Sequence, residues 1–173
     1  MPSAPLPLAP SIERQARGVW RYLRMQGAAP GEADDLVQEA FVVALQKGAL
    51  RLEPAAAFTF LRRTARFLFL RRRQGGLEAN LLADAVDELW QRDCEADGGD
   101  GMLDALRRCL SRLTGRARRA VELSYGLVGH DPASRDDVAA ALGLQPNGVK
   151  TLMQRARQQL RVCIEARPVE DRS

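Results

Sequence analysis

Hydrophobic residues recur along most of this chain at spacings of three and four, the period of a helix that buries one face. The first such segment starts at Ser11, a residue type that caps helix N-termini, and ends near Gly27. A second spans about residues 31–46. Its apolar face is made by Ala33, Leu36, Val37, Ala40, Phe41, Ala44 and Leu45. No run of alternating β-branched residues indicates a strand, so the pattern predicts an all-α fold.

Three more helices are predicted by the same spacing. After a connection at residues 47–54, which contains Gly48 and Pro54, the third helix covers about residues 55–74. Residues 102–113 carry leucines on one side and predict a further helix. Thr114 is placed to cap the helix after it, which reaches about Leu127.

Residues 134–160 have the layout of a helix-turn-helix. Ser134 is a good N-cap with Asp137 at the third helical position, and Gly143 stands where a left-handed turn residue is cheapest. Leu144 closes the turn, and Pro146 fits the first turn of a second helix. The positions expected to pack inward on the second helix are Val149, Leu152, Ala156 and Leu160.

The outer face of that second helix carries hydrogen-bonding side chains and no acid. These residues are Asn147, Lys150, Thr151, Gln154, Arg155 and Gln158. They can donate to phosphates and base edges in a major groove. An ordinary helical hairpin with a solvated face is the alternative, but the turn, the apolar spacing and the acid-free face together favour duplex DNA.

A different polar stripe lies on the predicted helix at 31–46. It consists of Asp35, Gln38, Glu39 and Val42, spaced along one side. Such a stripe is either a solvated face or a docking surface for a basic partner.

The third predicted helix is rich in arginine. From residue 51 to residue 73 there are seven arginines and a single acid, Glu53. That density repels itself unless phosphates or other anions lie nearby. Phe60 and Phe67 stand among these arginines and can either stack on unpaired bases or belong to the core.

Residues 75–101 are acidic instead. Eight acids face one arginine, Arg92, and the segment ends in a Gly-Gly-Asp-Gly run at 98–101. We expect a flexible linker that contains at most one short helix. This linker is either a solvated spacer or a strap that lies across one of the basic domains and masks it.

The 173 residues carry a net charge of +4, which suits a nucleic-acid partner. The only histidine, His130, and the cysteines Cys94, Cys109 and Cys163 are too widely spaced for a zinc site. We also expect no disulfide framework and a cytoplasmic location, since the chain opens without a signal peptide and contains no membrane-spanning run. No enzymatic motif is present, so neither an enzyme nor a cofactor is predicted.

Three motifs in this order resemble bacterial sigma factors. ADDLVQEAF at 33–41 resembles their core-polymerase-binding helix, and FLRRTAR at 60–66, followed by arginines at 71–73, is similar to their promoter-melting helix. GVKTLMQRARQQLR at 148–161 resembles the helix-turn-helix of their fourth domain. Order and spacing resemble the small extracytoplasmic-function (group IV) sigma factors, which keep only domains two and four.

The resemblance implies two small helical domains joined by a linker. Domain two would cover residues 11–74, the acidic linker 75–101 and domain four 102–167. Residues 1–10 and 168–173 would be tails, the first being proline-rich and disordered.

The resemblance also assigns roles to residues. The β′ subunit of polymerase would meet Asp35, Leu36, Gln38 and Glu39. The minus-ten promoter element would meet Arg62, Arg63, Arg66, Phe67 and Arg71, while the connection at 47–57 would hold a flipped base. The minus-thirty-five element would meet Asn147, Lys150, Thr151, Gln154 and Arg155. Phe67 and Arg71 depart from the family, which usually has asparagine at the first position and often an acid at the second.

The implied function is that of a sigma factor, which directs core RNA polymerase to promoter DNA and helps to melt it. An anti-sigma factor is a further partner that the resemblance allows. Two alternatives stay open. One is a helix-turn-helix transcription factor that binds operators as a dimer without polymerase or melting. The other is a sigma-like regulator that binds another regulator in place of a promoter.

Overall fold

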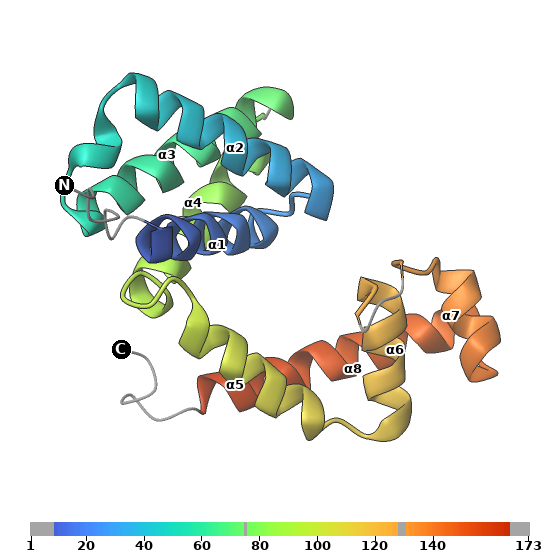
Figure 1. Cartoon of the computed structure of the whole chain (residues 1–173). Helices are drawn as coiled ribbons and strands as arrows, with labels where there is room; N and C mark the ends of the chain where they lie inside the picture. The colour runs from blue at the N-terminus through green and yellow to red at the C-terminus, as the bar shows by residue number, and fades with distance from the viewer. Residues whose placement is uncertain (1–8, 75, 128–130, 167–173) are drawn as a thin grey trace. The chain divides into compact units, whose positions relative to one another are not determined.

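The computed structural model describes residues 9–74, 76–127 and 131–166, and over these it contains eight α-helices, one 3-10 turn and no strand (Figure 1). The predicted all-α class is therefore confirmed for this part of the chain. The chain divides into two compact units, Met1–Asp100 (unit 1) and Gly101–Ser173 (unit 2). His130, the first eight residues and the predicted tail at 168–173 lie outside the described residues.

The first two helices of unit 1 follow the predicted pattern. Helix α1 (Ala9–Met25) begins two residues before Ser11 and buries Val19, Tyr22 and Leu23. Helix α2 (Pro30–Gln46) starts with the backbone N–H of Ala29 donating to Glu32 Oε2 at 3.2 Å, which satisfies an otherwise open donor. Its buried positions are Ala33, Leu36, Ala40 and Ala44, whereas Leu45, predicted to face the core, is exposed.

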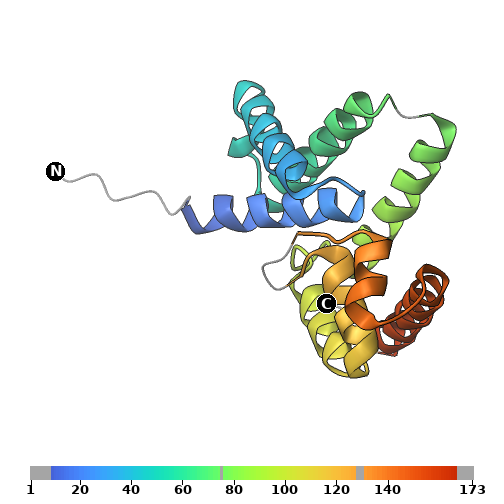
Figure 2. The same ribbon diagram turned by 90° about the vertical axis from the view of Figure 1, so that its right-hand side faces the viewer.

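A single 3-10 turn (Ala49–Arg51) leads into helix α3 (Pro54–Arg72). The buried positions of α3 are Ala57, Leu61, Arg62, Ala65, Leu68 and Phe69. Helices α1, α2 and α3 all pack against one another, and α4 follows from the end of α3 back along α1 (Figures 1 and 2).

The acidic segment contains a 17-residue helix, which is longer than the one short helix expected there. Helix α4 (Leu77–Asp93) belongs to unit 1 and is anchored there by Trp90, which is fully buried. The indole packs edge-on to Tyr22, with ring centroids 5.5 Å apart, and lies at 6.2 Å from Phe58. Four of its acids also form ion pairs with α3 or α1: Asp84, Asp87 and Glu95 with arginines of α3, and Asp100 with Arg21 of α1.

Unit 2 is built from α5 (Asp100–Ser111), α6 (Gly115–Tyr125), α7 (Arg135–Leu142) and α8 (Pro146–Glu165). Its main buried cluster comes from the last three helices and consists of Ala117, Ala120, Val121, Val138, Ala139, Val149, Met153 and Ala156. Ala105 and Cys109 of α5 are buried outside that cluster. Small residues predominate, which lets the helix axes approach closely.

A disulfide joins Cys109 of α5 to Cys163 of α8, so the expectation that the cysteines form no disulfide is wrong. The two residues are 54 positions apart in sequence, and a spacing of that size gives no local signal of pairing. It is the antiparallel course of α5 and α8 that brings them together. Within the described residues no helix is long and apolar enough to cross a membrane.

Candidate nucleic-acid interface

The helix-turn-helix of unit 2 has the predicted local geometry. Ser134 Oγ accepts a hydrogen bond from the backbone N–H of Asp137 at 3.2 Å and donates to the Asp137 carboxylate at 2.6 Å. At the other end of α7, Gly143 adopts a left-handed φ of 62°, and the N–H of Leu144 returns to the carbonyl of Ala139 at 2.9 Å. These two caps fix the length of α7 and the direction in which α8 starts.

Helix α8 presents one apolar and one polar face. Val149, Met153 and Ala156 are buried against α6 and α7. The inward positions differ in part from those predicted. Met153 is buried, with its Sδ 3.6 Å from Ser124 Oγ of α6, while Leu152 and Leu160 are only half-buried.

All six residues predicted for the outer face are exposed: Asn147, Lys150, Thr151, Gln154, Arg155 and Gln158. No acid occurs in α8 before Glu165. The Thr151 hydroxyl donates to the carbonyl of Asn147 at 3.2 Å, so its remaining capacity is that of an acceptor. The face can therefore approach a polyanion without repulsion from its own helix.

Unit 1 divides the five predicted minus-ten residues into two groups. Arg62 is only 2 % exposed; its guanidinium forms an ion pair with Asp87 and lies over the Tyr22 ring, 5.4 Å from the centroid. Its Nε lies 3.3 Å from Glu95 Oε2. A buried cation that already has two carboxylate partners cannot reach DNA in this conformation, so Arg62 holds α3 to α4 here and the predicted base contact does not fit its position.

Arg66 is half-buried and pairs with α4 as well. Its guanidinium forms an ion pair with Asp84, and its Nε lies 3.8 Å from Asp87 Oδ2. The acidic segment thus lies across a basic element of the same unit, which is the geometry of the masking alternative.

The second group, Arg63, Phe67 and Arg71, is exposed on the far side of α3. The Phe67 ring is 62 % exposed, and the Arg71 guanidinium stacks over it, 5.9 Å from the centroid. Arg63 and Phe67 also line an open groove of about 750 Å³. Its other walls are Val43, Leu52, Ala55, Ala56, Thr59, Phe60 and Thr64. The structure therefore brings Arg63 and Phe67 beside part of the connection predicted to hold a flipped base.

The predicted polymerase-binding residues on α2 are also divided. Asp35 and Gln38 are exposed, but Leu36 is fully buried in the core of unit 1 and cannot contact a partner, which corrects that prediction. Leu36 lies on the wide apolar face of α2, and this is the role that its spacing gives it. Glu39 is half-buried and accepts a hydrogen bond from Arg72 Nη2 at 2.8 Å.

The pKa values of Tyr22 and Glu32 are shifted in unit 1. Burial, followed by the nearby Asp87 carboxylate, raises the pKa of Tyr22, so its hydroxyl stays neutral and donates to Asp87 at 2.9 Å. A hydrogen bond from Arg73 lowers the pKa of Glu32. Each of these groups links two helical segments: Tyr22 of α1 bonds to Asp87 of α4, and Glu32 of α2 bonds to Arg73 after α3.

Within the described part of the chain, no group of three or more His, Cys, Asp or Glu side chains is arranged to hold a metal ion. Comparison of the chain with protein-family models, with curated proteins and with solved structures finds no match.

Proposed function

We propose that this protein is a sigma factor of the extracytoplasmic-function type, which recruits core RNA polymerase to a promoter. The observation that carries the proposal is the acid-free, fully exposed outer face of α8 in a capped helix-turn-helix. Such a helix can enter a major groove and read duplex DNA through Lys150, Gln154 and Arg155. In this proposal it reads the minus-thirty-five element.

Unit 1 would act on the unpaired strand of the minus-ten element. Bases stack on exposed aromatic rings, and guanidinium groups neutralise the phosphates between them. Phe67, with Arg63 and Arg71 beside it, offers both, and the groove next to Phe67 could accept a base rotated out of the duplex. No covalent chemistry is needed from this chain, because tighter binding of the open strand supplies the free energy of melting.

The exposed carboxylate and amide of α2 would dock on the coiled coil of the β′ subunit. Asp35 and Gln38 are available for that contact, with Glu39 at its edge. An anti-sigma protein could compete for the same surface.

One observation favours the second candidate, a helix-turn-helix factor that binds DNA without melting it. Arg62 and Arg66 are engaged by Asp87 and Asp84, which leaves three of the five predicted minus-ten residues exposed. A factor of this kind would bind its operator without polymerase.

The deciding experiment is run-off transcription with purified bacterial core polymerase across a pool of promoters. We expect the protein to select a subset of promoters, and Arg155→Ala to lose that selection while Arg116→Ala, an exposed arginine of α6, retains it. Phe67→Ala should fail on duplex templates and recover on templates whose minus-ten region is already open. No co-purification with polymerase and no start-site selection would overturn the proposal, and operator binding as a dimer would support the second candidate.

A further inference from the structure

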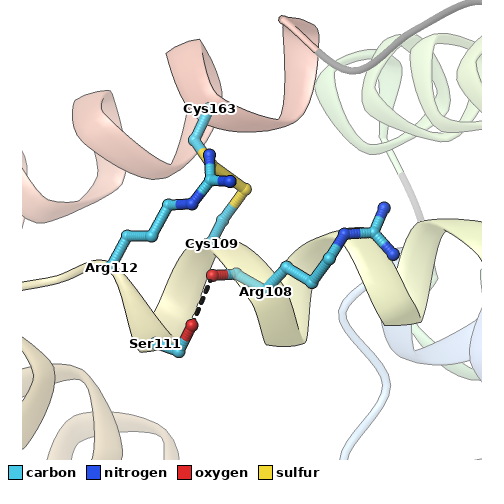
Figure 3. The surroundings of a disulfide bond; sticks show 5 residues. All are labelled: Arg108, Cys109, Ser111, Arg112 and Cys163. Carbon is cyan, nitrogen blue, oxygen red and sulfur yellow. Dashed lines mark hydrogen bonds between the residues drawn. A yellow bond between two sulfur atoms is a disulfide. The ribbon is translucent and has the colours of Figure 1, made fainter.

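A pair of cysteines in unit 2 takes no part in the function proposed above. Cys109 on α5 and Cys163 on α8 form a disulfide, and their Cα atoms are 5.9 Å apart (Figure 3). Disulfides occur where Cα atoms are about 4.4–6.8 Å apart. The packing of α5 on α8 therefore holds the two thiols where they can bond without backbone movement.

The two sulfur-bearing residues border an open groove of about 620 Å³ between α5 and α8. Cys109 is buried and Cys163 is half-buried, so Cys163 is the more exposed residue of the pair. The polar wall of the groove includes Arg112, Gln158 and Gln159. A small oxidant can therefore reach Cys163 in the folded protein.

Arg112 places a positive charge beside this sulfur. Its Nη1 donates to Cys163 Sγ at 3.8 Å, and Figure 3 shows its guanidinium alongside the disulfide, whereas the Arg108 side chain points away. Reactive cysteines have a cation close by, because the thiolate is the nucleophile. The charge, the groove and the second thiol are the parts of a site for thiol oxidation.

We propose that Cys109 and Cys163 form a reversible oxidation site, whose oxidant is a hydroperoxide and whose bond fastens α5 to the distal end of α8. The Cys163 thiolate attacks the terminal peroxide oxygen, the O–O bond breaks, and the products are a sulfenic acid and an alkoxide (hydroxide when the oxidant is hydrogen peroxide), which takes up a proton. The Cys109 thiolate then attacks the sulfenic sulfur, the S–S bond forms, the S–O bond breaks, and the expelled hydroxide takes up a proton to become water. Both sulfurs are oxidised as the peroxide is reduced, and a dithiol reverses the reaction by exchange.

The bond matters because α5 lies outside the main buried cluster of unit 2. In the described residues that cluster is formed by α6, α7 and α8, and Leu110 of α5 packs against it. The two buried residues of α5, Ala105 and Cys109, are not members of it. That cluster ends at Ala156 on α8, while Cys163 lies about two turns further on. Reduction therefore leaves α5 and the last turns of α8 held mainly by the contacts around Ala105 and Cys109.

The first experiment treats the reduced full-length protein with one equivalent of hydrogen peroxide. We expect the native protein to lose two hydrogens by mass without gaining oxygen, and its titratable thiols to fall from three to one, since Cys94 lies in unit 1 and takes no part in this disulfide. Dithiothreitol should restore all three. In Cys109→Ser the same treatment should leave an added oxygen on Cys163, because the resolving thiol is gone.

The second experiment separates the contribution of Arg112 from a general effect of charge. Arg112→Gln should slow peroxide-driven disulfide formation several-fold, whereas Arg107→Gln should not, because Arg107 lies on the same helix but is paired with Asp104 and is absent from the groove. An equal rate for all three proteins would overturn the role of Arg112.

The third measurement tests the consequence for the fold. Oxidised wild-type protein should melt in unit 2 roughly 10 °C or more above the reduced form, and hydrogen exchange in α5 should rise on reduction. This comparison needs no variant, so it stands even if a serine variant folds poorly. The proposal is overturned if the native protein keeps three thiols, if the bond forms no faster folded than in urea, or if both redox forms melt together.

Discussion

At the residue scale, Trp90 is the side chain through which α4 packs on the rest of unit 1. Its side chain is fully buried and contacts Tyr22 and Phe58, so three aromatic rings from α1, α3 and α4 meet at one point. In the sequence Trp90 is surrounded by acids, so the segment is predicted to be solvated and the burial of the tryptophan is not expected. The buried ring thus anchors α4 to unit 1.

We expect Trp90→Ala to destabilise unit 1 by about 3–5 kcal/mol, since it removes the ring and leaves a cavity. The control is Leu81→Ala on the same helix, where the side chain is 61 % exposed and the change should stay within about 0.5 kcal/mol. Denaturant unfolding followed by circular dichroism measures both. Equal stabilities for the two variants would show that α4 is not anchored by its tryptophan.

In unit 2 a single residue, Gly143, fixes the direction in which α8 starts. Its φ of 62° lies in the left-handed region, which costs an L-residue with a Cβ about 1–2 kcal/mol. Gly143→Ala should therefore lower the stability of unit 2 by about 1 kcal/mol and weaken binding to duplex DNA, because α8 loses its fixed direction. Gly115→Ala is the matched control, since Gly115 has no positive φ and open space where a Cβ would stand. Thermal melting and fluorescence anisotropy read the two effects.

At the element scale, α4 has two contacts with α3 that differ in kind. Asp84 is mostly exposed and pairs with the half-buried Arg66, whereas Asp87 pairs with Arg62 inside the unit and also accepts from Tyr22. An exposed pair contributes little to stability, while removal of one partner from a buried pair leaves an uncompensated charge. The two carboxylates are therefore expected to respond differently to the same substitution.

Asp84→Asn should leave stability within about 1 kcal/mol of wild type and raise the affinity of the free protein for single-stranded DNA, since Arg66 then keeps only its longer contact with Asp87. Asp87→Asn should cost about 3 kcal/mol, because Arg62 then stays buried with Glu95 alone. Urea unfolding and anisotropy with a labelled oligonucleotide give the two readings. If Asp84→Asn leaves DNA affinity unchanged, the α4 contact is purely structural and masks nothing.

The fold could be predicted from the sequence where it depends on neighbouring residues, and could not where it depends on residues far apart in the chain. Helices that bury a regular apolar stripe, such as α1, α2 and α8, were predicted within a few residues, and the Ser134 and Gly143 caps follow from local chemistry alone. The burial of Arg62 could not be predicted, since it needs Asp87 from 25 positions away. The disulfide was missed for the same reason: its two cysteines are neighbours only in the fold.

At the scale of the whole molecule, the proposed function treats each unit as a separate weak reader of DNA. Unit 2 offers one exposed helix face, and unit 1 offers a short surface around Phe67. A helix face alone makes few phosphate contacts, so its affinity is low and falls steeply with salt. Two weak sites on one chain gain from effective concentration only when their spacing matches that of the target. In the proposed mechanism polymerase fixes that spacing.

The free protein should therefore bind promoter DNA weakly, and addition of core polymerase should raise its apparent affinity by roughly 100-fold or more. Arg155→Ala and Phe67→Ala lie in different units, so each should remove most of that gain in the complex while changing the weak binding of the free protein only slightly. Anisotropy titrations at fixed salt, with and without polymerase, separate the two situations. Tight, sequence-specific binding by the isolated chain would contradict this view, because the two surfaces would then have no need of a partner to space them.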